Sequence, residues 1–264
     1  MSALEDRDNN LLVTRGNELL RHVIPLFRIP SNKRPELIGT ALLVNHSGNS
    51  YMVSAKHVID NMIHPSTLYY YVDRDKLMQL FGNVIHTIAP SSFKGQDSYD
   101  IAVVRLQEES RPPYPGVSKD AIPSSFLKSI DLPRVGKEYI ITGFPASKSR
   151  ANPNRKQLKS DPSSFGVASA NPAQYLSLNL QHETHLVMPL DVEKMTFPDG
   201  SIRRISDPHG MSGSPVWLYP DLSNTNNREF NYVVGIVIEY HKNKKLLVAT
   251  DIGVALQLIK DNLD

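Results

Sequence analysis

Cysteine is absent from the 264 residues of the sequence. Its absence excludes disulfide bonds, a thiolate nucleophile and zinc–thiolate clusters. A basic excess is also missing, because 29 Lys and Arg residues are balanced by 27 Asp and Glu residues. Dedicated nucleic-acid-binding proteins usually carry a strong positive charge. Nucleic acid is therefore not an expected partner.

The chain also lacks long hydrophobic runs. No stretch approaches the roughly 20 apolar residues that cross a bilayer. The first ten residues contain no basic start followed by an apolar segment, which is the pattern of a secretory signal. We therefore expect a cytoplasmic protein with no membrane partner, and the missing cysteines agree with a reducing compartment.

The sequence does contain many short apolar segments bounded by turn residues. These segments are rich in β-branched and aromatic residues and are too short for core helices; examples are 41–44, 101–104, 139–141 and 232–238. Such a pattern predicts the strands of an all-β sandwich or barrel.

Helical periodicity is confined to the two ends of the chain. It occurs around residues 11–23 and again in the tail, where Leu256, Ile259 and Leu263 recur three or four residues apart. The tail therefore predicts a short C-terminal helix over 256–264 with one apolar stripe.

A segment rich in proline and other turn residues interrupts the strand pattern in the middle of the chain. It divides the strands into two β units of similar length. The expected organisation is an N-terminal extension over 1–19, a first barrel over 20–106, a connector over 107–134 and a second barrel over 135–255.

Three segments carry residues suited to nucleophilic catalysis. Ser212 lies between Gly210 and Gly213, His57 ends a strand-like run, and Asp100 begins one. A hydroxyl nucleophile needs a base to accept its proton, and the base needs a carboxylate that orients it. Flanking glycines let the backbone turn sharply, so that two N–H groups can point at a developing oxyanion.

These motifs resemble the chymotrypsin-like (trypsin-like) serine peptidase family, whose order along the chain is His, Asp, Ser. The matching residues are His57 after a small residue, Asp-Ile-Ala-Val at 100–103 and Gly-x-Ser-Gly-x-Pro at 210–215. The run Ser-Gly-Ser-Pro-Val at 212–216 is most similar to bacterial glutamyl-endopeptidase-like branches. We therefore expect a bacterial intracellular member.

The resemblance implies two six-stranded β-barrels with the active site in the crevice between them. His57 and Asp100 would come from the first barrel and Ser212 from the second. Ser212 would attack a peptide carbonyl of a polypeptide substrate, and the N–H groups of Gly210 and Ser212 would form the oxyanion hole. No metal and no cofactor are expected.

The sequence departs from the family at the residue before the nucleophile. The family usually has Asp there, which receives a freed N-terminus on activation, whereas this chain has Met211. It also has no basic residue followed by an Ile-Val-Gly-Gly-like start. Either the enzyme is active as made, or another feature orders the oxyanion loop. A regulatory protein partner is one expected means of control.

Substrate preference is predicted from position alone. Ser206 and Asp207 fall near the base of the primary pocket, and Glu239 falls on the strand that lines the cleft. These acids favour a basic substrate side chain. The glutamyl branch has a histidine on that strand, where this chain has Val237 and Ile238, so a preference for glutamate does not carry over.

Other interpretations remain beside this one. Asp97 is an alternative to Asp100 as the catalytic acid, and a Ser212 in an unreactive Gly-Ser turn would make the chain a decayed peptidase. The main alternative function is a peptidase-like module that binds a peptide or partner protein without cleaving it. Its supporting features are Met211 and the unmatched primary pocket.

Two further enzyme classes fail on spacing. An α/β-hydrolase needs G-x-S-x-G, but residue 214 is a serine. A zincin needs H-E-x-x-H, but His182 and His185 are only three residues apart. On a strand two such histidines would face opposite sides of the sheet.

Overall fold

The computed structural model describes most of the chain. No helix among the described residues is long and apolar enough to cross a membrane. The described residues are 18–31, 34–60, 67–73, 76–88, 98–112, 119–130, 134–152, 157–196, 201–219 and 232–262.

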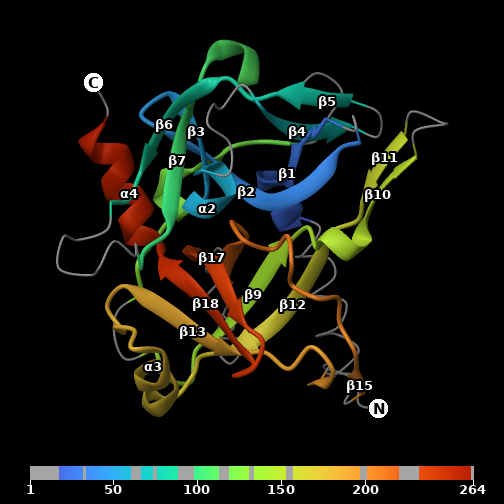
Figure 1. Ribbon diagram of the computed structural model, residues 1–264. Coiled ribbons are helices and arrows are strands. Elements are labelled where there is room, and N and C mark those ends of the chain that lie inside the picture. The colour runs from blue at the N-terminus through green and yellow to red at the C-terminus, as the bar shows by residue number, and fades with distance from the viewer. Residues whose placement is uncertain are drawn as a thin grey trace.

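The first half of the chain forms a closed β-barrel, which occupies the upper part of Figure 1. Its sheet has the order β5-β4-β1-β2-β3-β7-β6. The two end strands, β5 and β6, follow each other in the chain and are separated only by Leu80 and Phe81, so the sheet closes on itself. The strands are β1 (Val23–Arg28), β2 (Glu36–His46), β3 (Asn49–Ala55), β4 (Leu68–Asp73), β5 (Lys76–Gln79), β6 (Gly82–His86) and β7 (Ile101–Leu106).

The closure accounts for the difference between the strands named above and the six strands expected for this barrel. The N–H of Leu80 donates to Leu68 O of β4 at 2.8 Å, and the N–H of Gln107, just after β7, donates to Phe81 O at 3.0 Å. Strands β5 and β6 therefore act as one interrupted strand between β4 and β7, which leaves six strand paths. A two-residue strand of the connector, β8 (Ile122–Pro123), adds to β2 in parallel.

The second half forms a six-stranded sheet in the order β12-β9-β16-β17-β18-β13, in the lower part of Figure 1. Two short hairpins, β10–β11 and β14–β15, pair outside this sheet. The strands are β9 (Glu138–Gly143), β10 (Ser149–Asn152), β11 (Gln157–Ser160), β12 (Ser163–Ala168), β13 (His185–Pro189), β14 (Met195–Thr196), β15 (Ile202–Arg203), β16 (Pro215–Leu218), β17 (Val233–His241) and β18 (Leu246–Asp251).

The helices named for the described part of the chain are short. The α-helices are α2 (Lys56–Asp60), α3 (Pro172–Leu178) and α4 (Ile252–Asp261), and the 3-10 helices are η1 (Leu20–His22), η3 (Glu108–Ser110), η4 (Ser124–Phe126) and η5 (Ala146–Lys148). The periodicity predicted around 11–23 lies largely outside the described residues, and β1 begins at Val23.

The C-terminal helix begins earlier than the predicted 256. The Asp251 side chain accepts a hydrogen bond from the N–H of Gly253, so it caps the helix directly at the end of β18. The buried stripe is accordingly Ile252, Ala255 and Ile259. Of the predicted stripe, Ile259 is buried and Leu256 is half-buried against the core, whereas Leu263 lies outside the described residues.

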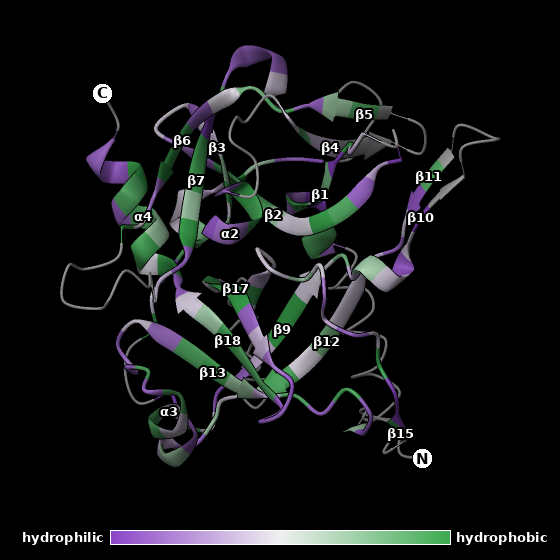
Figure 2. Ribbon diagram, viewed as in Figure 1, coloured by the Kyte–Doolittle hydropathy of each residue, from purple (hydrophilic) through white to green (hydrophobic). Residues whose placement is uncertain are grey.

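Both faces of the central strands in the second sheet are buried. Along β9, Tyr139 and Ile141 pack into the core of the second barrel, whereas Ile140 packs into the core that continues from the first barrel. This alternation follows from the period of two along a strand. Figure 2 shows the strands of both barrels as mostly hydrophobic segments. The interface between the barrels is therefore a continuous apolar core that fixes their relative position.

A buried ion pair joins the connector to the second barrel. Arg134 and Asp251 expose only 2% and 4% of their side chains, and Nη2 of Arg134 lies 2.6 Å from Oδ2 of Asp251. Arg134 also donates to the carbonyl of His185 on β13. The pair therefore ties β13, β18 and the start of α4 together.

Candidate active site

The pairing of β3 with β7 brings His57 and Asp100 together. Ala55, the last residue of β3, lies opposite Ile101, the first residue of β7. His57 follows Ala55 in the first turn of α2, and Asp100 immediately precedes Ile101. Two side chains 43 positions apart in the sequence thus meet at one edge of the first barrel.

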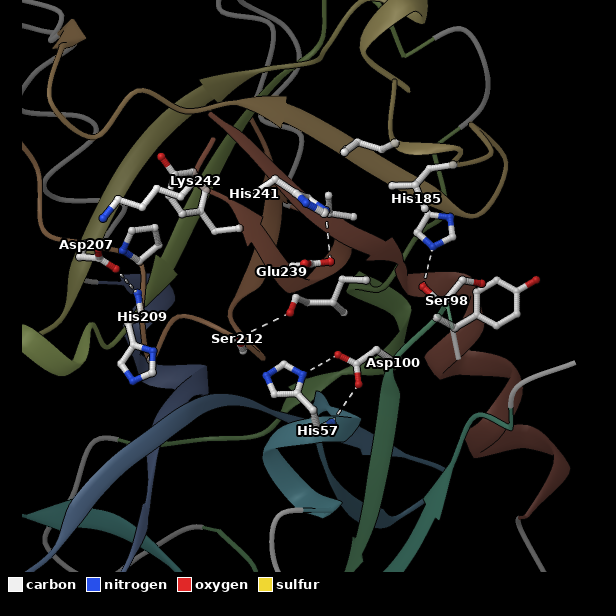
Figure 3. A pocket seen from close by; sticks show the side chains of 18 of the residues that line it. His57, Ser98, Asp100, His185, Asp207, His209, Ser212, Glu239, His241 and Lys242 are labelled. Carbon is white, nitrogen blue, oxygen red and sulfur yellow. Dashed lines mark hydrogen bonds and ion pairs between the residues drawn. The ribbon is translucent and has the colours of Figure 1, made fainter. Parts of the chain in front are cut away.

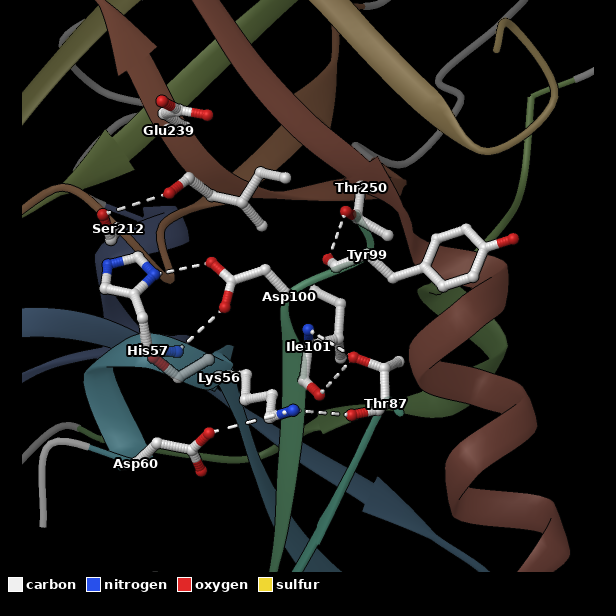
Figure 4. Close-up of polar contacts among 12 residues, drawn as sticks. Lys56, His57, Asp60, Thr87, Tyr99, Asp100, Ile101, Ser212, Glu239 and Thr250 are labelled. Atoms are coloured by element: carbon white, nitrogen blue, oxygen red, sulfur yellow. Dashed lines mark hydrogen bonds and ion pairs between the residues drawn. The ribbon is translucent and has the colours of Figure 1, made fainter. Parts of the chain in front are cut away.

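Asp100 contacts His57 through both carboxylate oxygens (Figure 4). Oδ2 lies 2.5 Å from the ring Nδ1 of His57, and Oδ1 accepts the backbone N–H of His57 at 2.9 Å. A carboxylate has no proton to give at neutral pH, so Nδ1 is the donor and Nε2 is left with a lone pair. The imidazole is therefore held in the tautomer that can accept a proton at Nε2.

The environment of His57 favours its protonated form. The hydrogen bond that His57 donates to Asp100 is the largest cause, and it raises the pKa of His57 above 6.5 against the opposing effect of burial. The charges of Asp100, Glu239 and Asp60 raise the pKa further. An imidazolium formed during a reaction would be stabilised by the same carboxylates.

Thr40 of β2 holds the loop that carries Ser212. Its N–H donates to Ser212 O at 2.8 Å, and its hydroxyl donates to Gly210 O at 3.0 Å. Gly213 has φ +88°, and a Cβ at this position would lie 1.9 Å from Thr40 O. A glycine is therefore required where the loop that carries Ser212 approaches the first barrel.

Ser212 faces the cleft between the barrels, opposite His57 (Figure 3). Its hydroxyl donates to Ile238 O at 3.5 Å, which is a long and weak hydrogen bond. A rotation about the Cα–Cβ bond is enough to redirect such a hydroxyl, and catalytic hydrogen bonds are often long before substrate binds.

In the loop that carries Ser212, the N–H groups of Gly210 and Ser212 take no part in the hydrogen bonds that hold the loop. His209 O accepts from Ala146 N at 2.8 Å, and Met211 O accepts from Ser214 N at 2.9 Å. In a trans peptide the N–H points opposite to the C=O, so the N–H groups of Gly210 and Ser212 point away from these partners. Within the described part of the chain, neither N–H donates to a backbone carbonyl. Both donors are therefore available for an oxyanion.

Met211 is buried in the core of the second barrel, with 1% of its surface exposed. In the family that the sequence resembles, this position usually holds an aspartate, whose charge needs a cationic partner. An apolar thioether needs only packing, which the surrounding core supplies. The loop beside Ser212 is thus anchored by hydrophobic contacts.

The residues predicted to select the substrate are only partly brought together. Asp207 and Glu239 line the cleft, whereas Ser206 is half-buried and is not one of the residues that line it. The Asp207 carboxylate accepts the N–H of His209 at 2.9 Å. Glu239, with 60% of its side chain exposed, pairs with Nε2 of His241 at 3.1 Å.

Two other sequence interpretations concern residues near the site. Asp97 lies outside the described residues. His182 stacks on Tyr175 in the turn before β13, with ring centroids 3.8 Å apart, so the assumption that His182 and His185 share a strand was wrong. His185 begins β13 and contacts the segment that leads to Asp100. No local pattern in the sequence indicates the contacts of His182, His185 and Thr40.

No family model and no curated protein sequence matches this chain. Among solved structures, it is similar to neuropsin, a serine protease expressed in the limbic system of mouse brain, with a TM-score of 0.57 and 17% identity over 92% of this chain and 95% of that one. The chain has the chymotrypsin-like double β-barrel fold.

A second solved structure with this fold is the scabies mite inactivated protease paralogue S-D1. It matches with a TM-score of 0.57 and 12% identity, over 92% of this chain and 92% of that one. The expected fold class is thus confirmed. At such low identity the likeness concerns the chymotrypsin-like fold and not the activity of its members.

Proposed function

We propose that this protein is a serine endopeptidase that uses Ser212, His57 and Asp100 as its catalytic triad. The observation that carries the proposal is the carboxylate–imidazole pair, Asp100 Oδ2 to His57 Nδ1 at 2.5 Å, facing the cleft into which Ser212 projects. The N–H groups of Gly210 and Ser212, which donate to no backbone carbonyl among the described residues, supply the second requirement of acyl transfer, the stabilisation of an oxyanion.

The geometry supports the following reaction. Ser212 Oγ bonds to the carbonyl carbon of a peptide while its proton passes to Nε2 of His57. The negative charge on the carbonyl oxygen is held by the N–H groups of Gly210 and Ser212. As the C–N bond breaks, His57 returns the proton to the leaving amine. Water then releases the acyl group by the same steps in reverse, with His57 again as the base.

The charges in the cleft support a preference for a basic substrate side chain. Asp207 lies on the loop before the nucleophile, and Glu239 lies on β17 across the cleft. A lysine or arginine side chain bound in the cleft would have the carboxylate of Asp207 or that of Glu239 as an ion-pair partner. The buried Met211 further supports an enzyme that needs no freed N-terminus to order its oxyanion loop.

A non-catalytic binding module is the second candidate. It is favoured by the hydrogen bond that turns the Ser212 hydroxyl to Ile238 O, and by the similarity to a protein described as an inactivated protease paralogue. In this case the cleft would hold a peptide but Ser212 would never be activated.

A fluorophosphonate probe separates the two candidates. In a peptidase the Ser212 oxygen bonds to phosphorus, fluoride leaves, and His57 accepts the proton. We expect labelling at Ser212 that disappears in Ser212→Ala and in denatured protein. The matched control is Ser98→Ala, which removes another hydroxyl that lines the cleft and should leave labelling intact. Folded protein that takes up no label would contradict the peptidase proposal.

We expect activity to be lost on acidification through a pH above 6.5. Only the neutral imidazole accepts the Ser212 proton, and its contacts raise the pKa of His57 above 6.5. The measurement is kcat/KM for a peptide substrate between pH 5 and 9. Asp60→Asn removes the smallest of the contributions that raise this pKa, so it should move the acidic limb down only slightly and preserve the plateau. Activity that increases toward pH 5 would contradict His57 as the base.

A further inference from the structure

The backbone just before Asp100 is held by three successive hydrogen bonds. Ser98 O lies 2.8 Å from Nε2 of His185, Tyr99 O accepts the Thr250 hydroxyl at 2.6 Å, and Asp100 O accepts the N–H of Lys56 at 2.7 Å. Figure 3 shows the contact of His185 with Ser98, and Figure 4 shows that of Thr250 with Tyr99. Every carbonyl from 98 to 100 therefore has a donor.

Two of these donors form a cross-strand pair in the other barrel. His185 on β13 lies directly opposite Thr250 on β18. Directly opposite residues project their side chains from the same face of a sheet. This is why one pair can reach the carbonyls of two consecutive residues, Ser98 and Tyr99. The segment that ends in Asp100 is thus held by the barrel that also carries Ser212.

The chemistry of His185 suits a neutral donor. A carbonyl can only accept, so the proton lies on Nε2 toward Ser98, and Nδ1 accepts from the Thr184 hydroxyl at 2.9 Å. Burial is the main cause that lowers the pKa of His185 below 6.5. The ring also stacks on Tyr99, with centroids 5.9 Å apart and an interplanar angle of 14°.

Asp100 needs such support because its backbone is strained. It has φ +48°, in the left-handed region that costs conformational energy for every residue but glycine, although aspartate and asparagine adopt it more readily than most. Strained conformations of this kind persist only where the surroundings hold them in place. The pair is itself rigidly held, because Arg134 donates to His185 O and forms its buried ion pair with Asp251, the neighbour of Thr250.

We propose that His185 and Thr250 are positioning residues that hold Asp100 in contact with His57. They do so by binding the carbonyls of Ser98 and Tyr99, and they thereby tie the acid of the triad to the barrel that carries its nucleophile. The catalytic meaning of this contact rests on the proposed peptidase function. The geometric claim, that the His57–Asp100 contact depends on His185 and Thr250, does not rest on that function.

The decisive experiment measures the His57 contact without turnover. In a Ser212→Ala background, NMR titration of His57 reports its pKa, which the hydrogen bond to Asp100 raises more than any other contact. We expect Thr250→Val, which keeps the side-chain shape and removes the hydroxyl, to move this pKa downward. Thr250→Ser should restore it. The other acids that raise the pKa, Glu239 and Asp60, are unchanged in all variants.

The same variants are then compared for activity with Ser212 in place. Thr250→Val should lower kcat by about tenfold with little change in KM, since the substrate does not contact this residue. Thr250→Ser should recover most of the loss. His185→Phe keeps a ring against Tyr99 but removes the donor, and the same loss is expected if it folds.

The matched control is Tyr175→Phe. The Tyr175 hydroxyl accepts the N–H of Val187 on β13 at 3.0 Å, so its loss also removes a buried hydrogen bond from that strand. This variant should lower Tm but leave the His57 pKa and kcat unchanged. The proposal is overturned if Thr250→Val lowers Tm in the same way and leaves the pKa of His57 at its original value. A wild-type protein without turnover would refute the peptidase function, and the NMR comparison would still decide the positioning role.

Discussion

Replacement of Ser212 by alanine is expected to lower kcat by about 10⁶, as in other hydrolases with a complete triad. In the proposed reaction the hydroxyl oxygen is the atom that bonds to the substrate. The folded structure should be unaffected, because among the described residues the side chain has a single hydrogen bond, the weak one of 3.5 Å to Ile238 O. Burst and steady-state kinetics with a peptide ester, together with a melting curve, measure both effects.

Loss of turnover must be separated from loss of binding. Ser212→Ala should still bind a peptide substrate, since Asp207 and Glu239 and the cleft are unchanged. His57→Ala should reduce turnover to a similar extent, and the double variant should be no worse than either single one, because triad members act as a unit. Turnover that is equal in Ser212→Ala and in the wild type would show that Ser212 is not the nucleophile.

Much of the fold could be predicted from the sequence, because the patterns that mark strands and turns are local. Short β-branched runs marked strands such as β7 and β17, and the turn-rich connector divided them into two units. The meeting of His57 with Asp100 came from a family resemblance. Its physical cause, the pairing of Ala55 with Ile101, depends on strand pairing that no local pattern specifies.

The contacts that support the site were not predictable, because their partners are distant in the chain. Thr40 binds Gly210 O across 170 positions, and Thr250 binds Tyr99 O across 151. Each appears in the sequence as one polar residue in an apolar strand, a pattern that equally fits a residue whose hydroxyl simply satisfies a neighbouring carbonyl. His185 stands out in the sequence only as part of an incomplete zinc motif with His182, whereas the role proposed for it requires no metal.

Replacement of Asp100 by asparagine is expected to lower kcat by about 10⁴ while preserving the fold. The asparagine oxygen can still accept the N–H of His57, as Oδ1 does now at 2.9 Å. Asparagine also tolerates the φ of +48° at this position. Its amide, however, donates to Nδ1 of His57, so that the ring proton moves to Nε2 and faces Ser212. The base then has no lone pair where the hydroxyl proton must go.

The pH profile gives this variant a second, independent signature. Removing the carboxylate removes the largest contribution that raises the pKa of His57, so the acidic limb of the residual kcat/KM should move down. The matched variant is Asp97→Asn, which tests the alternative acid. If Asp100 is the acid of the triad, Asp97→Asn retains both the rate and the position of the limb. A large loss in Asp97→Asn with none in Asp100→Asn would transfer the role to Asp97, and the contact between Asp100 and His57 would then be structural.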